Sequence, residues 1–405
     1  MTELPPRPNQ PVYLDNQATT RCDPRVVQAM LPFFSEEYGN PHSAEHVMGQ
    51  RVEAAVEGAR AQVAALAGAD TREIVFTSGA TEANNIAIKG AARFAASMGD
   101  SRRRIVTVAT EHKCVLESVA DLAAEGFEPV VLPVRPDGTL DPDALRSALA
   151  VPTLLVSVMA VNNETGVIQD IFGLASIAKE AGALFHSDLA QALGKIPVDL
   201  TGWKVDLASI SGHKLYGPKG IGALFVRRRP RVRLTPLFSG GGQERGWRSG
   251  TLPAPLIVGL GEACRLAGVE MAVEAERIRE LRQGLLERLR GGIPGLQVNG
   301  GFTARIAGNL NLTFPAASAS ALMAALPDLC VSTGSACSSA AIEPSYVLRA
   351  LGLSDADAAR TLRIGIGRFT SAADIDYAAS ALTAAHAASA AAAIETQRPT
   401  TQSKA

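Results

Sequence analysis

The sequence predicts an α/β fold built on a mostly parallel sheet that is covered on both faces. Between about residues 50 and 265, short β-branched and apolar runs alternate with longer amphipathic runs. The strand-like runs are apolar throughout, which is typical of strands buried on both sides. The chain has 405 residues, which is long for one compact domain, so two domains are expected.

Strand-like and helix-like runs follow one another along this part of the chain. The strand-like runs cover 74–77, 105–109, 153–161, 183–186, 205–210 and 222–226, and helical patterns cover 81–91 and 113–125. In parallel sheets a ligand binds beyond the carboxyl ends of the strands. We therefore expect one shared site among the polar residues near these ends, which are Thr81, His112, Asn163, Asp188, Gln191, His213 and Lys214.

The residue composition and the pattern of predicted elements change after about residue 265. A long charged helix is expected over 270–290, followed by a glycine-rich link and the strand-like NLNLTF. We interpret residues 21–265 as a large domain. Residues 1–20 and 266–405 are interpreted as a smaller α+β domain that ends in a frayed tail.

Charge and composition favour a small-molecule ligand. Thirty-nine basic and forty acidic residues give a net charge of −1, so no overall field would attract nucleic acid or an anionic membrane. The sequence shows neither a signal-peptide pattern nor an apolar run of membrane-spanning length, so a cytoplasmic protein is expected. The five cysteines are scattered, and we expect neither structural disulfides nor a metal site.

The segment SGHKLYGPKGIGAL, residues 211–224, places Lys214 at the end of an apolar strand in glycine-rich backbone. Most lysines are simply solvated, but a lysine that forms a Schiff base must be partly buried to become an uncharged nucleophile. Asp188 follows another strand-like run. It could be an ordinary helix cap, or it could pair with the ring nitrogen of a pyridine cofactor.

A glycine turn at SGATE, residues 78–82, opens a predicted helix and could bind a phosphate through backbone N–H groups and Thr81. Any helix start looks similar, so this signal is weak alone. Gly212 and Gly217 have the spacing of a nucleotide-binding P-loop, but Pro218 follows where the motif needs Gly-Lys-Ser/Thr, which excludes that site.

Two further residues could react with or bind a substrate. Cys337 lies in STGSACSSA, where small neighbours would bury it poorly, although a lone cysteine is more often a small buried hydrophobe. Arg363, in TLRIGIGRF, alternates with apolar residues on a strand-like segment. Its guanidinium could bind a substrate carboxylate or form an internal salt bridge.

Taken together, these segments resemble the cysteine desulfurases, which are fold-type I pyridoxal-phosphate enzymes of the class V aminotransferase type. The similarity runs from residue 13 to residue 370, in the order YLDNQATT, GNPHS, FTSGATEANN, EHKCVL, VNNETG, HSDLAQALGK, SGHKLYGPKGIGAL, GGGQERGWRSGT and GSACSSAAIEPSYVLRALG. The resemblance implies a seven-stranded, mostly parallel sheet in the large cofactor-binding domain. The smaller domain would carry the loop with Cys337.

The resemblance also implies a role for each residue that matches a family motif. Lys214 would bind pyridoxal 5′-phosphate covalently, Asp188 would pair with its ring nitrogen, and His112 would stack on the ring and move protons. Arg363 would bind the substrate carboxylate, and Cys337 would carry the persulfide. Gln191 and Asn163 would contact the phenolic oxygen of the cofactor, and Asn163 would also lie near the substrate. The phosphate would be bound by Ala80, Thr81, Ser211 and His213, and by Thr251 from the other subunit of a homodimer.

The implied reaction converts L-cysteine to L-alanine and leaves a persulfide on the enzyme. The long loop after Cys337 resembles the branch of the family that serves iron–sulfur assembly and tRNA thiolation, so the acceptor would be an iron–sulfur scaffold or a thiolation carrier. The tail has no recognisable apolar-aromatic docking segment. Leu189 stands where a small residue is usual, so a change in packing beside the ring is expected.

Two other hypotheses remain compatible with parts of the sequence. A selenocysteine lyase or an aminotransferase for small amino acids would share Lys214 and Asp188, but an aminotransferase has no need of Cys337. A non-catalytic sulfur carrier could keep the fold alone. The joint presence of the catalytic residue types argues against that hypothesis.

Overall fold

The computed structural model describes residues 8–333 and 344–396 and contains a seven-stranded sheet in the order β2-β8-β7-β6-β5-β3-β4. Strand β8 runs antiparallel to both of its neighbours, and all other pairs are parallel. The predicted α/β class with a mostly parallel sheet is therefore confirmed. The strands are β2 (Ile74–Thr77), β3 (Arg104–Val108), β4 (Glu128–Leu132), β5 (Thr153–Ser157), β6 (Leu184–Asp188), β7 (Leu207–Ser211) and β8 (Gly222–Val226).

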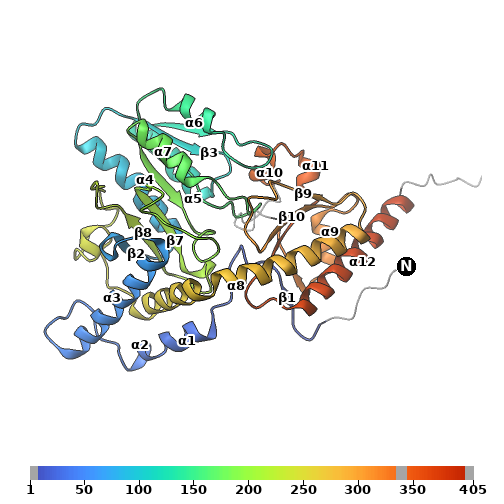
Figure 1. Ribbon diagram of the computed structural model, residues 1–405, viewed down its shortest axis with the longest axis horizontal. Helices are drawn as coiled ribbons and strands as arrows, with labels where there is room; N and C mark the ends of the chain where they lie inside the picture. The colour runs from blue at the N-terminus through green and yellow to red at the C-terminus, as the bar shows by residue number, and fades with distance from the viewer. Residues whose placement is uncertain (1–7, 334–343, 397–405) are drawn as a thin grey trace, which may run out of the picture.

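Helices cover both faces of this sheet (Figure 1). Successive strand residues point to opposite faces, so Ile105 packs in one apolar cluster and Val106 in another. The first cluster includes α4 (Ala80–Ser97) and α5 (Lys113–Asp121), and the second includes residues of the helices on the other face. These helices are α1 (Pro24–Met30), α3 (Val47–Ala67), α7 (Ile171–Glu180) and the N-terminal part of α8 (Ala254–Gly292).

A second sheet has a separate apolar core of its own. It has the antiparallel order β12-β10-β9, with β9 (Gln297–Val298), β10 (Asn309–Thr313) and β12 (Thr361–Gly365). Helices α9 (Ala319–Ala325) and α12 (Ala372–Thr396) and the C-terminal part of α8 pack against it. A short parallel pair joins β1 (Val12–Tyr13) to β11 (Leu329–Cys330) nearby.

Helix α8 is longer than the sequence pattern indicated, because it begins at Ala254 rather than near residue 270. Its first part contains Gly259 and Gly261, which lower helix propensity and masked the helix in the sequence. Both glycines are needed for close packing. A Cβ on Gly259 would lie 2.6 Å from Met30 Sδ, and one on Gly261 would lie 2.6 Å from Ala59 Cα in α3. The helix contributes to both cores, and the boundary expected at residue 265 falls inside it.

Other element boundaries differ modestly from the prediction. The strand expected over 153–161 ends at Ser157, and β4 was missed because it is a half-exposed edge strand that contains Pro129. The remaining helical elements are α2 (Pro32–Ser35), α6 (Pro142–Ala148), α10 (Tyr346–Ala350), α11 (Asp355–Ala358), η1 (Thr71–Glu73), η2 (Leu122–Glu125), η3 (Gly212–Lys214) and η4 (Glu244–Gly246).

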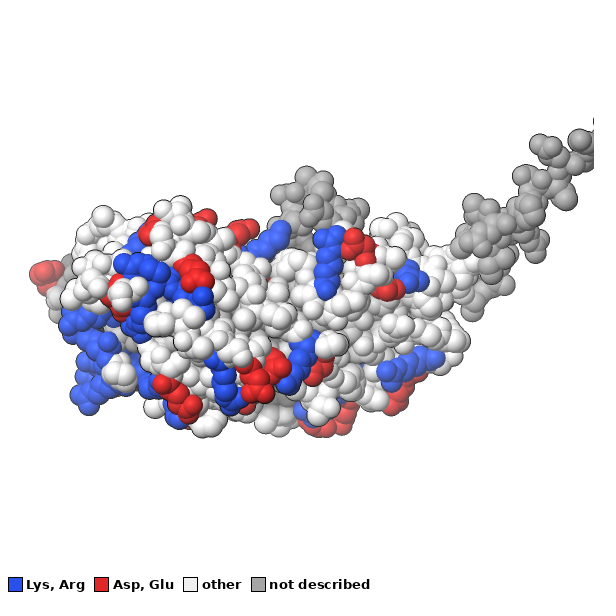
Figure 2. All heavy atoms as spheres, turned by 90° about the horizontal axis from the view of Figure 1, so that it is seen from above, with Lys and Arg blue, Asp and Glu red and all other residues white. Residues whose placement is uncertain are grey.

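Charges of both signs are interspersed over much of the face seen in Figure 2, with basic side chains gathered toward one end. In the described part of the chain, every helix is too short or too polar to cross a bilayer.

Candidate active site

A cavity of about 580 Å³ lies where polar residues follow the strands of the large sheet. The N-terminal segment at Gln17 to Thr19 and Arg363 of the second sheet also line it. The cavity collects ten of the residues that the sequence predicted for one site, which are Ala80, Thr81, His112, Asn163, Asp188, Gln191, Ser211, His213, Lys214 and Arg363.

Lys214 ends the short helix η3, directly after β7. Its Nζ donates hydrogen bonds to the backbone carbonyls of Gln17 and Ala18, each over 2.6 Å. The side chain is half-buried and lines the cavity. The lysine is therefore anchored by a segment almost 200 residues away, and its amine is within reach of a ligand in the cavity.

Asp188 is the last residue of β6, and it is 4% exposed. Its Oδ2 accepts a hydrogen bond from Asn84 Nδ2 over 2.7 Å, and its Oδ1 accepts one from the backbone N–H of Ala190 over 2.8 Å. Two donors hold the carboxylate in one direction at the cavity wall. A buried carboxylate fixed in this way is suited to bind a cationic ring nitrogen.

His112 caps the N-terminus of α5. Its Nδ1 accepts a hydrogen bond from the backbone N–H of Cys114 and lies 3.0 Å from Cys114 Sγ. Because Nδ1 is occupied as an acceptor, Nε2 carries the proton in the neutral ring. Asn84 also donates to Cys114 Sγ over 3.1 Å, so a continuous polar chain joins Asp188 to His112.

Glu111, next to His112, is fully buried. Its Oε1 accepts a hydrogen bond from the backbone N–H of Met159. Burial, with the neighbouring charge of Asp188, raises the pKa of Glu111 well above its usual value. This favours the neutral acid at Glu111.

One end of the cavity is suited to a phosphate. Gly79 has a φ of 152°, a conformation that favours glycine, and α4 begins at the next residue with its first N–H groups not used by the helix. Gly222 lets β8 approach this turn, because a Cβ there would lie 2.6 Å from Gly79 Cα. Helix N-termini of this kind bind anions.

His213 lies at the same end of the cavity and is held by Thr19 Oγ1, 3.0 Å from its Nδ1. Burial, with the charges of nearby Lys214 and other lysines, lowers the pKa of His213 to about 4. The ring is therefore neutral near pH 7 and would contact a phosphate as a hydrogen-bonding group.

Gln191 donates from Nε2 to the carbonyl of Gln17 over 2.8 Å, and its Oε1 accepts from Lys195 Nζ over 2.6 Å. Two buried amide oxygens that line or border this region, Asn163 Oδ1 and Gln17 Oε1, have no hydrogen-bond partner within the described residues. Buried polar atoms are normally satisfied, so these oxygens indicate that a polar ligand completes the site.

Arg363 reaches the cavity from β12 and is 2% exposed. Its guanidinium pairs with Asp15 Oδ1 over 2.9 Å and donates to the carbonyl of Asn163 over 3.1 Å. Ser332 Oγ also donates to Asp15 Oδ1. Arg363 therefore forms an internal ion pair and also lines the cavity, and its binding of a substrate carboxylate stays a prediction.

Three other predicted positions have different outcomes. Thr251 is exposed and does not line the cavity of this chain, and Cys337 lies outside the described residues. Leu189 does not line the cavity, and its effect on packing beside the ring stays a prediction. Leu189 is fully buried in the core behind β6, and Ala190 faces the cavity instead.

Sequence reasoning missed several residues that shape the site. Asn84 lies one helical turn after Ala80, on the same face of α4, and that spacing could have indicated it. Gln17 and Asp15 lie in YLDNQATT, but their contacts depend on a fold that joins the two ends of the chain. Cys114 could have been found from its position two residues after His112.

Comparison with known proteins defines the class. The family model described as aminotransferase class-V matches residues 12–378, which is most of the chain. The protein belongs to this family, and within it to the cysteine desulfurases.

The relatives that place it there are similar over nearly their whole length. Cysteine desulfurase IscS of Rickettsia felis is 52% identical over 371 residues, which cover 92% of this chain and 90% of that protein. Among solved structures, a NifS-like protein superposes with a TM-score of 0.84 at 36% identity, covering 93% of this chain and 99% of the other. DndA from Streptomyces lividans has a TM-score of 0.75 at 43% identity, with coverage of 87% and 99%.

Proposed function

We propose that this protein is a pyridoxal-phosphate-dependent cysteine desulfurase that converts L-cysteine to L-alanine and transfers the sulfur to Cys337. The observation that carries the proposal is the position of Lys214 and Asp188 on the wall of one cavity, with Arg363 entering from the second sheet. The overall reaction consumes L-cysteine and the Cys337 thiol and yields L-alanine and a Cys337 persulfide.

The residues of the cavity fit the cofactor. The turn at Gly79 and the start of α4, with Ser211 and His213, would bind its phosphate. Lys214 Nζ would bind its carbonyl carbon, and Asp188 would keep its ring nitrogen protonated. When bound, pyridoxal phosphate supplies an electron-accepting ring that makes the bonds at the substrate's Cα and Cβ labile.

The protein residues supply binding and proton transfer. Arg363 would orient the substrate carboxylate with its planar guanidinium. The Lys214 amine, once displaced by substrate, or His112 would take the Cα proton. Asp188 needs no movement for its part, because Asn84 and the N–H of Ala190 already fix its direction.

We also propose that Cys337 receives the sulfur by attack of its thiolate on the substrate sulfur, with the sulfur's bond to carbon breaking and the electron pair leaving with the carbon. The described chain that resumes at residue 344 is tied to residues near the cavity. Ser345 Oγ donates to Glu164 Oε2 over 2.5 Å, and Tyr346 donates to the carbonyl of Glu111 over 2.7 Å.

The assembly proposed for the enzyme is a homodimer. Thr251 is exposed in the single chain and lies just before α8, so it is available to contact the phosphate end of a partner's cavity. The acceptor of the persulfide would be an iron–sulfur scaffold or a thiolation carrier.

Substitution of Cys337 tests the activity directly. Cys337→Ser should bind pyridoxal phosphate with the wild-type visible spectrum but release no sulfide from L-cysteine in the presence of a reductant. Cys330→Ser, at a half-buried free thiol, is the matched control and should stay active. Sustained sulfide release by Cys337→Ser would overturn the role of this thiol and favour a lyase.

A further inference from the structure

A second lysine, Lys195, contacts the active-site residue Gln191 from outside the main cavity. Lys195 lies seven residues after Asp188 in the turn that follows β6, and it is not among the residues that line the main cavity. Its Nζ donates to Gln191 Oε1 over 2.6 Å. Gln191 itself is 3% exposed and lines the main cavity. Lys195 therefore reaches the wall of the main cavity through a hydrogen bond to the Gln191 amide.

This contact and the carbonyl of Gln17 together decide which way the amide points. A side-chain amide offers an oxygen acceptor on one side and an NH2 donor on the other, and the two sides have nearly the same shape. An ammonium group has three donors and no acceptor. The oxygen of Gln191 must therefore face Lys195, and Nε2 must face the opposite side, where one of its hydrogens binds the carbonyl of Gln17 over 2.8 Å.

We propose that Lys195 is a positioning residue that fixes the Gln191 amide so that its NH2 group, and not its oxygen, is presented to the phenolic oxygen of the bound cofactor. This inference rests on the proposed function, because it assigns a role toward pyridoxal phosphate. A phenolate oxygen is stabilised by a donor and destabilised by a facing carbonyl oxygen. The orientation of one amide therefore changes the charge that the ring can carry.

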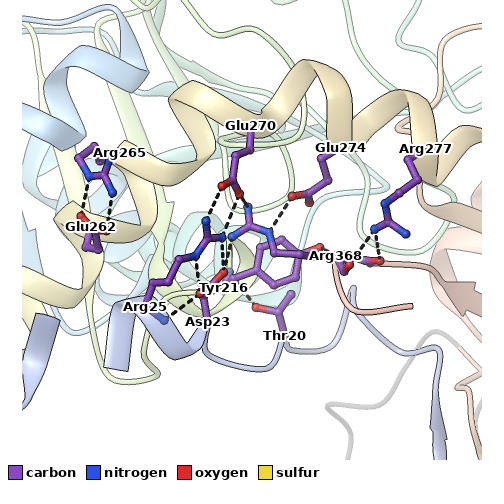
Figure 3. Close-up of polar contacts among 11 residues, drawn as sticks. Thr20, Asp23, Arg25, Tyr216, Glu262, Arg265, Glu270, Glu274, Arg277 and Arg368 are labelled. Atoms are coloured by element: carbon purple, nitrogen blue, oxygen red, sulfur yellow. Dashed lines mark hydrogen bonds and ion pairs between the residues drawn. The ribbon is translucent and has the colours of Figure 1, made fainter. Parts of the chain in front are cut away.

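Charged and aromatic side chains surround the small cavity next to Lys195. Lys195 lines this separate cavity of about 30 Å³, roughly the volume of one water molecule in the liquid, together with Glu274 and Tyr216. Glu274 lies on α8 and accepts a hydrogen bond from Arg368 Nε over 2.7 Å. Glu270 and Glu274 both face Arg368 in Figure 3. The guanidinium of Arg368 stacks on the Tyr216 ring, 4.3 Å from its centroid.

Burial lowers the pKa of Lys195 to about 7, with the charges of Lys214 and Arg363 lowering it further and Glu274 opposing them. These neighbours come from η3, β12 and α8. While Lys195 is charged it can only donate to Gln191. After losing its proton it gains a lone pair that could accept from Nε2, so the constraint on the amide is strongest in the charged form.

A double-mutant cycle on cofactor-loaded protein without substrate tests the proposal. The variants are Lys195→Met, Gln191→Ala and the two together, and the readout is the pH midpoint of the visible absorption band of the bound cofactor. Lys195→Met should raise the midpoint by about one pH unit, because a phenolic oxygen that loses a donor holds a shared proton more tightly. In the Gln191→Ala background, Lys195→Met should add no further shift.

The double-mutant cycle separates the effect of the Gln191 amide orientation from the effect of removing the Lys195 charge. An unchanged midpoint in Lys195→Met would overturn the proposal, and so would a shift of the same size in both backgrounds, because the lysine would then act by its charge alone. Lys179→Met, at an exposed position on α7, is the matched control and should leave the midpoint unchanged. If Lys195→Met does not fold, as judged by thermal unfolding, Lys195→Gln takes its place in the cycle.

The visible spectrum distinguishes failure of the proposed function from failure of the Lys195 proposal. Wild-type protein that binds no pyridoxal phosphate would show no visible band at all. Failure of the Lys195 proposal would instead leave a wild-type band whose titration does not depend on the Lys195–Gln191 contact.

Discussion

Asn84 Nδ2 donates a hydrogen bond to Asp188 Oδ2 over 2.7 Å and thereby connects α4 to the carboxylate at the end of β6. Asn84 is fully buried, and the same NH2 group also reaches Cys114 Sγ beside His112. One amide thus orients the residue proposed for the ring nitrogen and contacts Cys114, which lies beside His112, a residue proposed for proton transfer.

Asn84→Ala should weaken cofactor binding. Hydrogen bonds to charged groups contribute about 1.5–3 kcal/mol, so the affinity of the apoprotein for pyridoxal phosphate should fall by at least about tenfold. Spectroscopic titration of the apoprotein measures this. Asn85→Ala is the control, because the Asn85 side chain donates to the carbonyl of Thr81 in its own helix and not to Asp188. Equal affinities for the two variants would contradict the role given to Asn84.

Arg363→Lys should raise the KM for L-cysteine by about 10- to 100-fold, since an ammonium cannot keep the planar contacts of the guanidinium with Asp15 and a substrate carboxylate together. Steady-state kinetics measure KM and kcat separately, and kcat should change less. Arg360→Lys, near the surface beside Asp357, serves as the control. A KM unchanged in Arg363→Lys would exclude this residue from substrate binding.

The apoprotein should lose stability as the pH falls below about 6.5. His186 is fully buried between Ser157 and Ser209, and burial lowers its pKa from the usual value of 6.5 to about 3. The unfolded chain then binds a proton that the folded chain does not, so the stability is complete above pH 6.5 and declines toward pH 3. At pH 5 the loss from His186 is about 2 kcal/mol.

Urea unfolding at pH 7 and pH 5 checks this expectation. His186→Gln, which cannot titrate, should lose less stability than wild type between the two pH values. A residual slope should remain, because the pKa of His213 is also lowered, to about 4, and acts in the same direction. Identical slopes for the two proteins would show that His186 is not the group responsible.

Much of the fold and the candidate site could be predicted because their signals are local. The apolar runs that became β2 and β8 were located with their bounds, and ten of the predicted side chains, Lys214 and Asp188 among them, line one cavity. The motif order indicated the family. These signals survive in sequence because most of them depend on a residue type at or soon after the end of a buried strand.

The parts that could not be predicted depend on contacts between distant segments. The carbonyls of Gln17 and Ala18 that bind Lys214 are backbone groups and leave no trace in the residue types. The Asp15–Arg363 pair joins residues 348 positions apart. Helix α8 was predicted too short because its packing glycines look like helix breakers. The burial of Leu189, directly after β6, depends on the core residues that pack against it from other elements.

The central claim is that Lys214 binds the cofactor, and reductive labelling tests it most directly. Wild-type protein loaded with pyridoxal phosphate is reduced with borohydride, digested and analysed by mass spectrometry. The account predicts a phosphopyridoxyl group on Lys214. A label on Lys219, which lines the same cavity, or on Lys195, with Lys214 unmodified, would contradict it.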